Sequence, residues 1–287
     1  MISWCGPSLL DRAEDRRGDD DWVASQWRAP GTRVIAVTPD GSLGWAGDGP
    51  GFQPASGELS ERHLLLGLLE GRAVFADVLP DLAAGRTLRA VMDGLSEPDL
   101  EVAFAAAGLA AWHSRAAFCG SCGSATAPVR AGLERRCTGC GRELYPRVDP
   151  AVIVAVTDDD DRLLLGRQPS WPAGRMSVFA GFVEAGESLE QAVHREVFEE
   201  VGLRLAEPTY LGSQPWPFPR SMMVGFAARA VGTALTVDNT EIEHARWFSR
   251  SELTAALAAG EVGLPMSTSI ASGMIGQWRE ERLGAVG

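Results

Sequence analysis

The chain has 287 residues and a formal net charge of −12, with 45% hydrophobic and 22% charged residues. This combination is typical of a globular protein of more than one domain. The acidic balance argues against a protein that holds nucleic acid mainly by electrostatic attraction to its phosphates. No apolar run approaches the roughly 20 residues that cross a bilayer. Charged residues interrupt the first thirty positions, where a secretory signal would need an apolar stretch. We therefore expect a cytoplasmic protein without membrane contact.

Three domains are expected along the chain. Residues 1–97 alternate short apolar pieces, such as 33–38 and 73–79, with Gly, Pro and Asp turns, which indicates an irregular α+β domain. Residues 98–145 contain most of a connecting helix and then four cysteines. The helix is predicted over 97–117, with Pro98 in its first turn. Residues 146–287 contain strand-like runs and three predicted helices. The runs are 151–156, 163–167, 176–180 and 222–230, and the helices include 249–259, with a Ser249/Glu252 capping box, and 267–283.

The cysteines form two pairs with metal-knuckle spacing. Cys119 and Cys122 are separated by two residues, as are Cys137 and Cys140, and fourteen residues lie between the pairs. Four thiolates in this arrangement suit tetrahedral Zn²⁺ and leave no coordination position for water, so the zinc is expected to be structural. The alternative, two disulfides, does not suit a reducing cytosol. Cys5 is expected to be a spare reduced thiol.

The third predicted helix, which follows residue 187, is the best marked in the chain. Ser188 and Gln191 form a capping box, and Gly202 stands where a left-handed C-terminal cap is expected. An apolar stripe recurs every fourth residue at Val193, Val197 and Val201. Three glutamates share a face beside this stripe: Glu196, Glu199 and Glu200. Like charges at this spacing repel and need either full solvation or a bound cation.

The segment 181–203 resembles the Nudix box, G-x5-E-x7-R-E-U-x-E-E-x-G-U with U aliphatic, and matches it at every fixed position. The resemblance implies that Glu196, Glu199 and Glu200 are ligands of Mg²⁺ or Mn²⁺. It also implies that Glu187 lies in the outer shell and that Arg195 orients the carboxylates. Hard divalent cations prefer such oxygen ligands and can also hold substrate phosphates.

A second segment, 213–221, reads SQPWPFPRS and resembles the motif of NADH pyrophosphatases of the NudC kind. Its prolines fix an extended loop whose aromatic faces suit a flat base or nicotinamide ring. The resemblance implies that four residues of this segment bind substrate: Gln214, Trp216, Phe218 and Ser221. It also implies that Ala271, before the final helix, binds substrate.

Three more positions follow from the same resemblance. Phe182 and a Tyr145 of the partner subunit would sandwich one ring in a homodimer. Glu241, on a strand far along the chain, would complete the metal site and is preferred over Glu243 because of its spacing to Trp247. Either Glu199 or Glu241 would be the general base.

The implied fold is a Nudix mixed-sheet α/β/α sandwich, preceded by a small four-cysteine zinc ribbon and an N-terminal α+β domain. The implied activity is hydrolysis of NAD(H) to nicotinamide mononucleotide and AMP, with removal of NAD caps from RNA. A Nudix hydrolase of other dinucleotides, such as ADP-ribose or diadenosine polyphosphates, is an alternative. So is a zinc-ribbon module that binds RNA or protein. Five arginines near the ribbon would form a solvated or subunit-contact face, or would meet a capped RNA: Arg130, Arg135, Arg136, Arg142 and Arg147.

Overall fold

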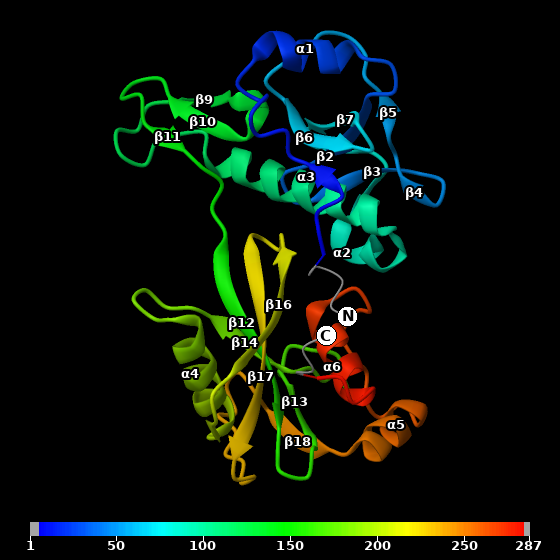
Figure 1. Cartoon of the computed structure of the whole chain (residues 1–287), viewed down its shortest axis with the longest axis vertical. Coiled ribbons are helices and arrows are strands. Elements are labelled where there is room, and N and C mark those ends of the chain that lie inside the picture. The colour runs from blue at the N-terminus through cyan, green and yellow to red at the C-terminus, as the bar shows by residue number, and fades with distance from the viewer. Residues whose placement is uncertain (1–5, 284–287) are drawn as a thin grey trace. The chain divides into compact units, whose positions relative to one another are not determined.

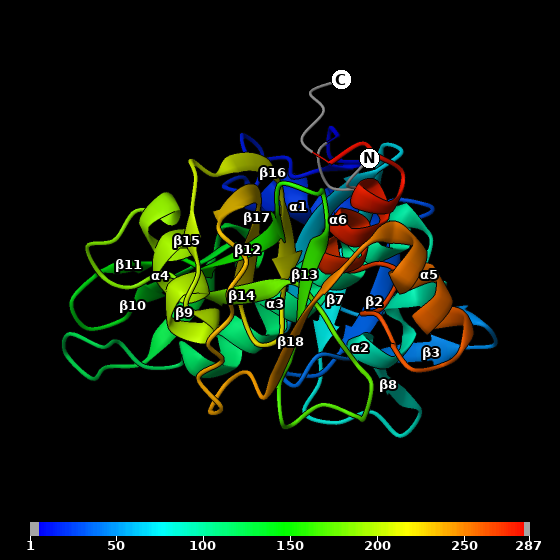
Figure 2. The same ribbon diagram turned by 90° about the horizontal axis from the view of Figure 1, so that it is seen from below.

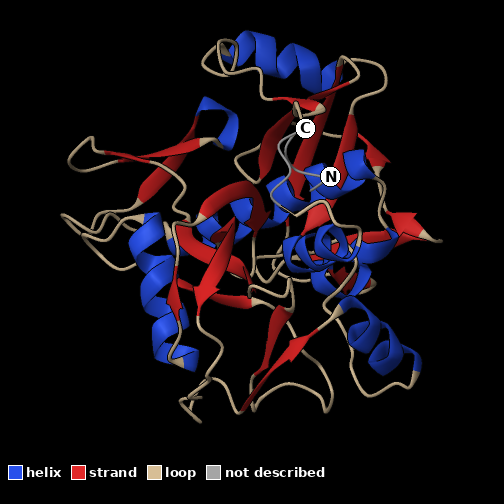
Figure 3. Cartoon of the chain, turned by 60° about the horizontal axis from the view of Figure 1, so that its bottom comes forward, coloured by secondary structure: helices blue, strands red, loops and turns tan. Residues whose placement is uncertain are grey.

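The computed structural model of the chain describes residues 6–283, so Cys5 lies outside the described residues. The chain forms two compact units. The C-terminal unit contains residues 149–215 and 221–283 with Gly6, and the N-terminal unit contains residues 7–148 and 216–220. Both units contain helices and strands (Figure 3). Within the described part of the chain, no helix has the length and the apolar character needed to cross a membrane.

The C-terminal unit is built on a mixed seven-stranded sheet. Its strand order is β15-β17-β12-β13-β18, with β14 paired to β12 and β16 paired to β17. The strands are β12 (Asp149–Thr157), β13 (Leu163–Arg167), β14 (Phe179–Phe182), β15 (Arg204–Leu205), β16 (Thr209–Trp216), β17 (Ser221–Val231) and β18 (His244–Phe248). The central pair, β12 and β17, is parallel, whereas β13 pairs with β18 and β14 with β12 in antiparallel fashion.

Helices cover both faces of this sheet because its central strands are apolar on both sides. The helices are α4 (Leu189–Val201), α5 (Arg250–Ala258) and α6 (Ile270–Arg279). In β12, Val152 and Val154 face the core shared with α4, whereas Ile153 faces the core shared with α5 and α6. Figures 1 and 2 show α4 and α6 on opposite sides of the strands. The predicted α/β/α sandwich is confirmed.

Two predicted elements of this unit differ from the observed ones by three residues or more at one or both ends. The strand predicted over 176–180 is β14, which begins at Phe179, because Ser177 forms only an isolated bridge with Gly166. The final helix is shorter than the predicted 267–283. Ser269 caps its N-terminus by accepting the N–H of Ser272, and a left-handed residue, Glu281, follows its end.

The N-terminal unit contains two sheets, one of eight strands and one of three. The larger has the order β1-β6-β7-β2-β3-β4, with β5 on β2 and β8 on β3, and the smaller is β11-β10-β9. Its strands are β1 (Leu10–Asp11), β2 (Arg33–Val37), β3 (Ser42–Ala46), β4 (Gly49–Pro50), β5 (Gln53–Pro54), β6 (His63–Leu69), β7 (Arg72–Val78), β8 (Gly85–Thr87), β9 (Thr126–Val129), β10 (Glu134–Cys137) and β11 (Glu143–Leu144). The two predicted apolar pieces are β2 and β7, which pair in parallel.

The helices of this unit complete its α+β character. They are α1 (Asp20–Arg28), α2 (Leu88–Val91) and α3 (Glu97–Arg115), with 3₁₀ turns η1 (Met92–Gly94) and η2 (Arg130–Gly132). The predicted connecting helix is α3, capped by Ser96, and it ends two residues before the predicted end at Ala117. It packs against the larger sheet, and the cysteines follow directly.

Candidate functional site

Helix α4 is fixed at both ends and along one side. The Ser188 hydroxyl accepts the N–H of Gln191, and the Gln191 side chain accepts the N–H of Ser188, so the predicted capping box is confirmed. Gly202 ends the helix with a left-handed φ of 72°. The predicted apolar stripe of Val193, Val197 and Val201 is fully buried against the sheet. The direction of each glutamate is therefore set by the helix itself.

Two of the three glutamates of the Nudix box are buried, so they do not form a solvated acidic face. Glu196 is 9% exposed and Glu200 is 3% exposed, whereas Glu199 is exposed. Burial, with the charges of Glu196 and Glu241 next in importance, raises the pKa of Glu200 to about 8. Among the described residues, the Glu200 Oε2 atom has no hydrogen-bond partner. A buried carboxylate oxygen without a donor suits a bound cation.

Arg195 connects the carboxylates, as the family resemblance implies. Its guanidinium donates to both Glu187 oxygens at 2.8 Å, to Glu196 Oε1 at 2.8 Å and to Glu199 Oε2 at 3.1 Å. It also donates to the Phe182 carbonyl oxygen at 2.9 Å. The hydrogen bonds from Arg195 lower the pKa of Glu187 to about 2. Glu187 is thus held as a carboxylate that neutralises and orients the arginine.

The structure distinguishes Glu241 from Glu243. The charge of Glu241 contributes to raising the pKa values of Glu196 and Glu200, for both of which burial is the largest cause. Glu243 instead pairs with Arg167. The prediction that Glu241 lies on a strand is wrong, because it stands in the loop before β18. A fourth carboxylate thus lies near the pair on α4.

Carboxylate oxygens that lie near one another are the ligands that a divalent metal prefers. The charges of Glu196 and Glu241 both act on Glu200, and Arg195 bridges Glu196 and Glu199. One buried oxygen of Glu200 has no hydrogen-bond partner among the described residues, so these side chains could hold such a cation. Gly181 on β14 leaves room for the Glu196 carboxylate, which would overlap any Cβ at position 181. The glycine that opens the box is therefore required by a close approach, since its φ is not left-handed.

The four cysteines converge as predicted. Their Sγ atoms lie within 4.8 Å of one another, with Cys119 3.8 Å from Cys140 and Cys122 3.4 Å from Cys137. All four are free thiols rather than disulfides. Four sulfurs at about 2.3 Å from a tetrahedral zinc would be about 3.8 Å apart. Hydrogen bonds from Ser124 lower the pKa of Cys122, which favours the thiolate that a metal needs, whereas hydrogen bonds with Cys122 and Cys137 raise the pKa of Cys140.

Three of the arginines around the ribbon are engaged inside the N-terminal unit. Arg130 pairs with Glu14 at 2.7 Å, and Arg136 pairs with Glu143 at 3.0 Å. Arg135 donates to the Thr126 carbonyl oxygen at 2.8 Å. Their charges are therefore partly committed to the fold, which weakens the alternative of a freely available RNA-binding face.

The ring-bearing residues differ in their surroundings. Phe182 is 57% exposed, and Tyr145 is 50% exposed with its hydroxyl donating to Glu143 at 2.8 Å. Trp216 and Phe218 pack edge to face, with ring centroids 5.1 Å apart. Both belong to the N-terminal unit.

The other residues of the proline-rich segment support the fold. Gln214 is fully buried, its amide nitrogen donates to the Thr268 carbonyl, and its oxygen accepts the N–H of Ile270 at the start of α6. Ala271 is the second residue of α6, rather than lying before the final helix, and is buried in the core. Ser221 is buried at the first position of β17. The use of Gln214 as a brace for α6 was not visible in the sequence, since its partners lie more than fifty residues away.

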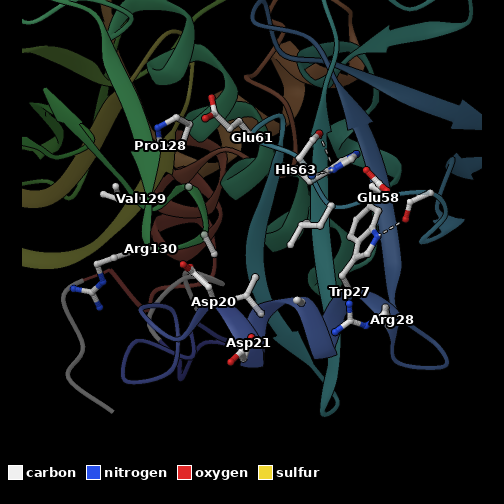
Figure 4. A pocket seen from close by; sticks show the side chains of 17 residues that line it. Asp20, Asp21, Trp27, Arg28, Glu58, Glu61, His63, Pro128, Val129 and Arg130 are labelled. Atoms are coloured by element: carbon white, nitrogen blue, oxygen red, sulfur yellow. Dashed lines mark hydrogen bonds between the residues drawn. The ribbon is translucent and has the colours of Figure 1, made fainter. Parts of the chain in front are cut away.

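A cleft of about 820 Å³ lies in the N-terminal unit, and sequence reasoning assigned it no role. Its walls come from α1, from the segment that leads into β6, and from the turn at Pro128–Gly132 (Figure 4). Trp27 forms part of the wall, stacks on His63 with ring centroids 4.4 Å apart, and donates its ring N–H to the Gly57 carbonyl. The cleft contains none of the carboxylates of the Nudix box.

The sequence also matches known families and proteins. A model of the NUDIX domain matches residues 147–265, and a model of the NADH pyrophosphatase zinc ribbon domain matches residues 114–145. The chain is 39% identical over 293 residues to "NAD-capped RNA hydrolase NudC" of Mycobacterium bovis, covering 93% of this chain and 92% of that protein. The corresponding protein of Mycobacterium tuberculosis matches with the same identity and coverage.

A human relative matches a shorter part of the chain. It is "NAD-capped RNA hydrolase NUDT12", 42% identical over 196 residues, which cover 64% of this chain and 42% of that protein. The Nudix box is thus found on the Nudix fold, and the zinc ribbon of the same family precedes it in the sequence. The protein described here belongs to the NudC family of Nudix hydrolases.

Proposed function

We propose that this protein hydrolyses the pyrophosphate bond of NAD(H), giving nicotinamide mononucleotide and AMP, and removes NAD caps from RNA 5′ ends by the same reaction. The observation that carries the proposal is the carboxylate cluster on α4, in which Glu200 is buried with an unpaired oxygen. The names of the relatives and the SQPWPFPRS segment support the choice of substrate.

In this proposal Glu196, Glu199, Glu200 and Glu241 hold Mg²⁺ or Mn²⁺. Such a cation, when bound, polarises the pyrophosphate and lowers the pKa of water. Arg195 keeps the carboxylates oriented through its hydrogen bonds, and its charge offsets part of their repulsion. Glu199 or Glu241 takes the proton from the attacking water. Both are exposed, so both are open to solvent and substrate.

The four cysteines are proposed to hold a structural Zn²⁺ within the N-terminal unit. We propose that the protein is a cytoplasmic homodimer and that the ring-bearing part of the substrate contacts Phe182 and Trp216. The same part of the substrate would also contact Tyr145 of the partner subunit. An aromatic ring that is about half exposed, such as that of Phe182, can gain stacking contacts when a flat ligand binds. Further contacts are proposed for Gln214, Phe218, Ser221 and Ala271. The buried Gln214 would contribute to substrate binding by holding the start of α6 in place.

The test is product analysis with NADH and with NAD-capped RNA side by side, in Mg²⁺ and in Mn²⁺. We expect reduced nicotinamide mononucleotide and AMP from NADH, and a 5′-monophosphate RNA from the capped substrate. Glu199→Gln serves as the inactive control, because it removes a ligand charge while keeping the size of the side chain. Faster turnover of ADP-ribose or diadenosine polyphosphates would favour a different dinucleotide as substrate. Release of free nicotinamide would contradict the proposal, since a pyrophosphate site does not cleave the glycosidic bond.

A further inference from the structure

Asp238 organises the loop that carries Glu241. This loop connects β17 to β18, and Asp238 Oδ2 accepts the backbone N–H groups of Thr240 and Glu241 at 3.1 and 2.8 Å. Its Oδ1 accepts the N–H of Ile242 at 2.8 Å. One carboxylate thus fixes three consecutive peptide N–H groups, of which Glu241 is the middle one. Ile242 is 3% exposed and anchors the end of the loop in the core.

The same loop is hydrogen-bonded to the C-terminus of α4. The backbone N–H of Asp238 donates to the Glu200 carbonyl oxygen at 3.2 Å, and that of Thr236 donates to the Val201 carbonyl oxygen at 3.0 Å. These bonds also satisfy two of the carbonyl groups that a helix end leaves without an intrahelical partner. The backbone position of Glu241 is therefore fixed relative to the helix that carries Glu200.

A carboxylate is the side chain that suits this position. It offers two acceptor oxygens to three N–H groups, whereas asparagine offers one oxygen and an amide group that would face N–H groups as a second donor. Replacement of Asp238 by asparagine therefore breaks at least one of the three bonds. Both oxygens of Asp238 accept backbone N–H groups, and one of these groups is that of Glu241.

We propose that Asp238 is a positioning residue, which holds Glu241 where it can complete the cation site formed by Glu196 and Glu200. The inference rests on the proposed function, in which Glu241 is a metal ligand. Partners that orient a metal ligand typically contribute about 10- to 100-fold to metal affinity. Loss of the Asp238 carboxylate should therefore weaken cation binding before substrate is present.

The experiment measures Mn²⁺ binding to the full-length protein without substrate, by electron paramagnetic resonance of the free ion. Wild type, Asp238→Asn, Glu241→Gln and the double variant are compared well below their melting temperatures. We expect Asp238→Asn to weaken Mn²⁺ binding by about tenfold or more. In the Glu241→Gln background, Asp238→Asn should have little further effect on Mn²⁺ affinity, because both substitutions remove the same interaction between Glu241 and the cation. The Mg²⁺ concentration for half-maximal NADH hydrolysis should rise by a similar factor in Asp238→Asn.

Two further variants separate positioning from charge and from folding. Asp159→Asn removes the same charge from an exposed aspartate that pairs with Arg229, and should bind Mn²⁺ as wild type does. Asp238→Ser keeps an acceptor that can take the N–H two residues ahead, and should retain part of the affinity if Asp238→Asn folds poorly.

The outcomes separate this inference from the proposed function. Wild-type Mn²⁺ affinity in both Asp238 variants, with or without a lower melting temperature, would overturn the positioning role alone. An equal loss in the Glu241→Gln background would also overturn it, since Asp238 would then act independently of Glu241. Wild-type affinity in Glu241→Gln itself would contradict the ligand assignment of the proposed function, and this inference with it.

Discussion

The backbone of Gly181 lies directly against the carboxylate of Glu196, so that any side chain at position 181 would occupy the space of that carboxylate. Gly181→Ala should therefore displace Glu196 without straining the backbone of β14, whose conformation at this position does not require glycine. We expect kcat/KM to fall by about 10²-fold, since a displacement of about 1 Å can have this effect.

Gly276→Ala in α6 is the matched control for this prediction. A Cβ at position 276 meets no atom within 4 Å, and alanine is the better helix former. Its activity should equal that of the wild type and its melting temperature should not fall. Full activity of Gly181→Ala would show that the close approach does not position Glu196 for catalysis.

Glu200→Gln should stabilise the metal-free protein and lower metal-dependent activity by orders of magnitude. Because burial and the charges of Glu196 and Glu241 raise the pKa of Glu200 to about 8, the metal-free folded protein must take up a proton at pH 7 that the unfolded chain does not bind, which lowers stability. Glutamine does not titrate and removes this cost, but it also removes a ligand charge. Thermal melting in a chelator and kcat at saturating Mg²⁺ measure the two effects, with exposed Glu207→Gln as control. A lower melting temperature for metal-free Glu200→Gln would contradict a destabilising role of buried Glu200.

Cys119→Ser should release zinc and destabilise the N-terminal unit, because the folding of such a ribbon is linked to its metal. Elemental analysis of the purified protein should give about one zinc per chain for wild type, since four thiolates fill one tetrahedral site. Ser121→Ala, which changes an exposed residue between the first two cysteines, should keep its zinc. Wild-type protein that holds less than about half an equivalent of zinc, with all thiols reduced, would contradict the assignment.

Phe182→Ala should lower kcat/KM for NADH more than for a small diphosphate substrate without a second ring. Stacking contributes about 0.5–1.5 kcal/mol beyond burial, which corresponds to about a two- to twelvefold effect. Phe198→Ala is the matched control, because Phe198 is also exposed, at 50%, and lies on α4. The measurement is kcat/KM of each variant for both substrates. Equal losses on the two substrates would indicate a general defect instead of lost stacking.

His113 should make the N-terminal unit less stable in acid. Burial, which outweighs a hydrogen bond to the Gly132 carbonyl, lowers the pKa of His113 from 6.5 to about 4. As pH falls below about 6.5, His113 of the unfolded chain binds a proton, whereas His113 of the folded protein binds one only near pH 4. The free energy of unfolding therefore falls as pH falls from about 6.5 towards 4. Between pH 7 and pH 5 the loss should be about 2 kcal/mol.

The measurement is urea unfolding at both pH values. His113→Gln removes the titrating group and should reduce this pH dependence, even if it lowers stability at pH 7. His194→Gln, which changes an exposed histidine of α4, should keep the wild-type dependence. An unchanged pH dependence in His113→Gln would show that the buried histidine is not its source.

The sequence by itself determined the features that depend on neighbours within one or two turns of chain. Ser188, Gln191 and Gly202 set both ends of α4, because capping requires only side chains and N–H groups a few residues apart. The cysteine spacing predicted four converging thiols for a similar reason, since each pair needs only a tight turn. The continuous apolar run at 151–156 predicted the strand β12, and its apolar residues on both faces are consistent with a covered sheet.

Tertiary structure decided what depends on contacts between distant segments. The burial of Glu200 while Glu199 stays exposed follows from how α4 packs on the sheet, which the spacing of the glutamates does not specify. The approach of Glu241 to the cluster depends on the loop held by Asp238, and the brace from Gln214 to α6 joins residues 56 positions apart. Such contacts depend on the pairing and packing of whole elements, and no local pattern of residue types encodes them.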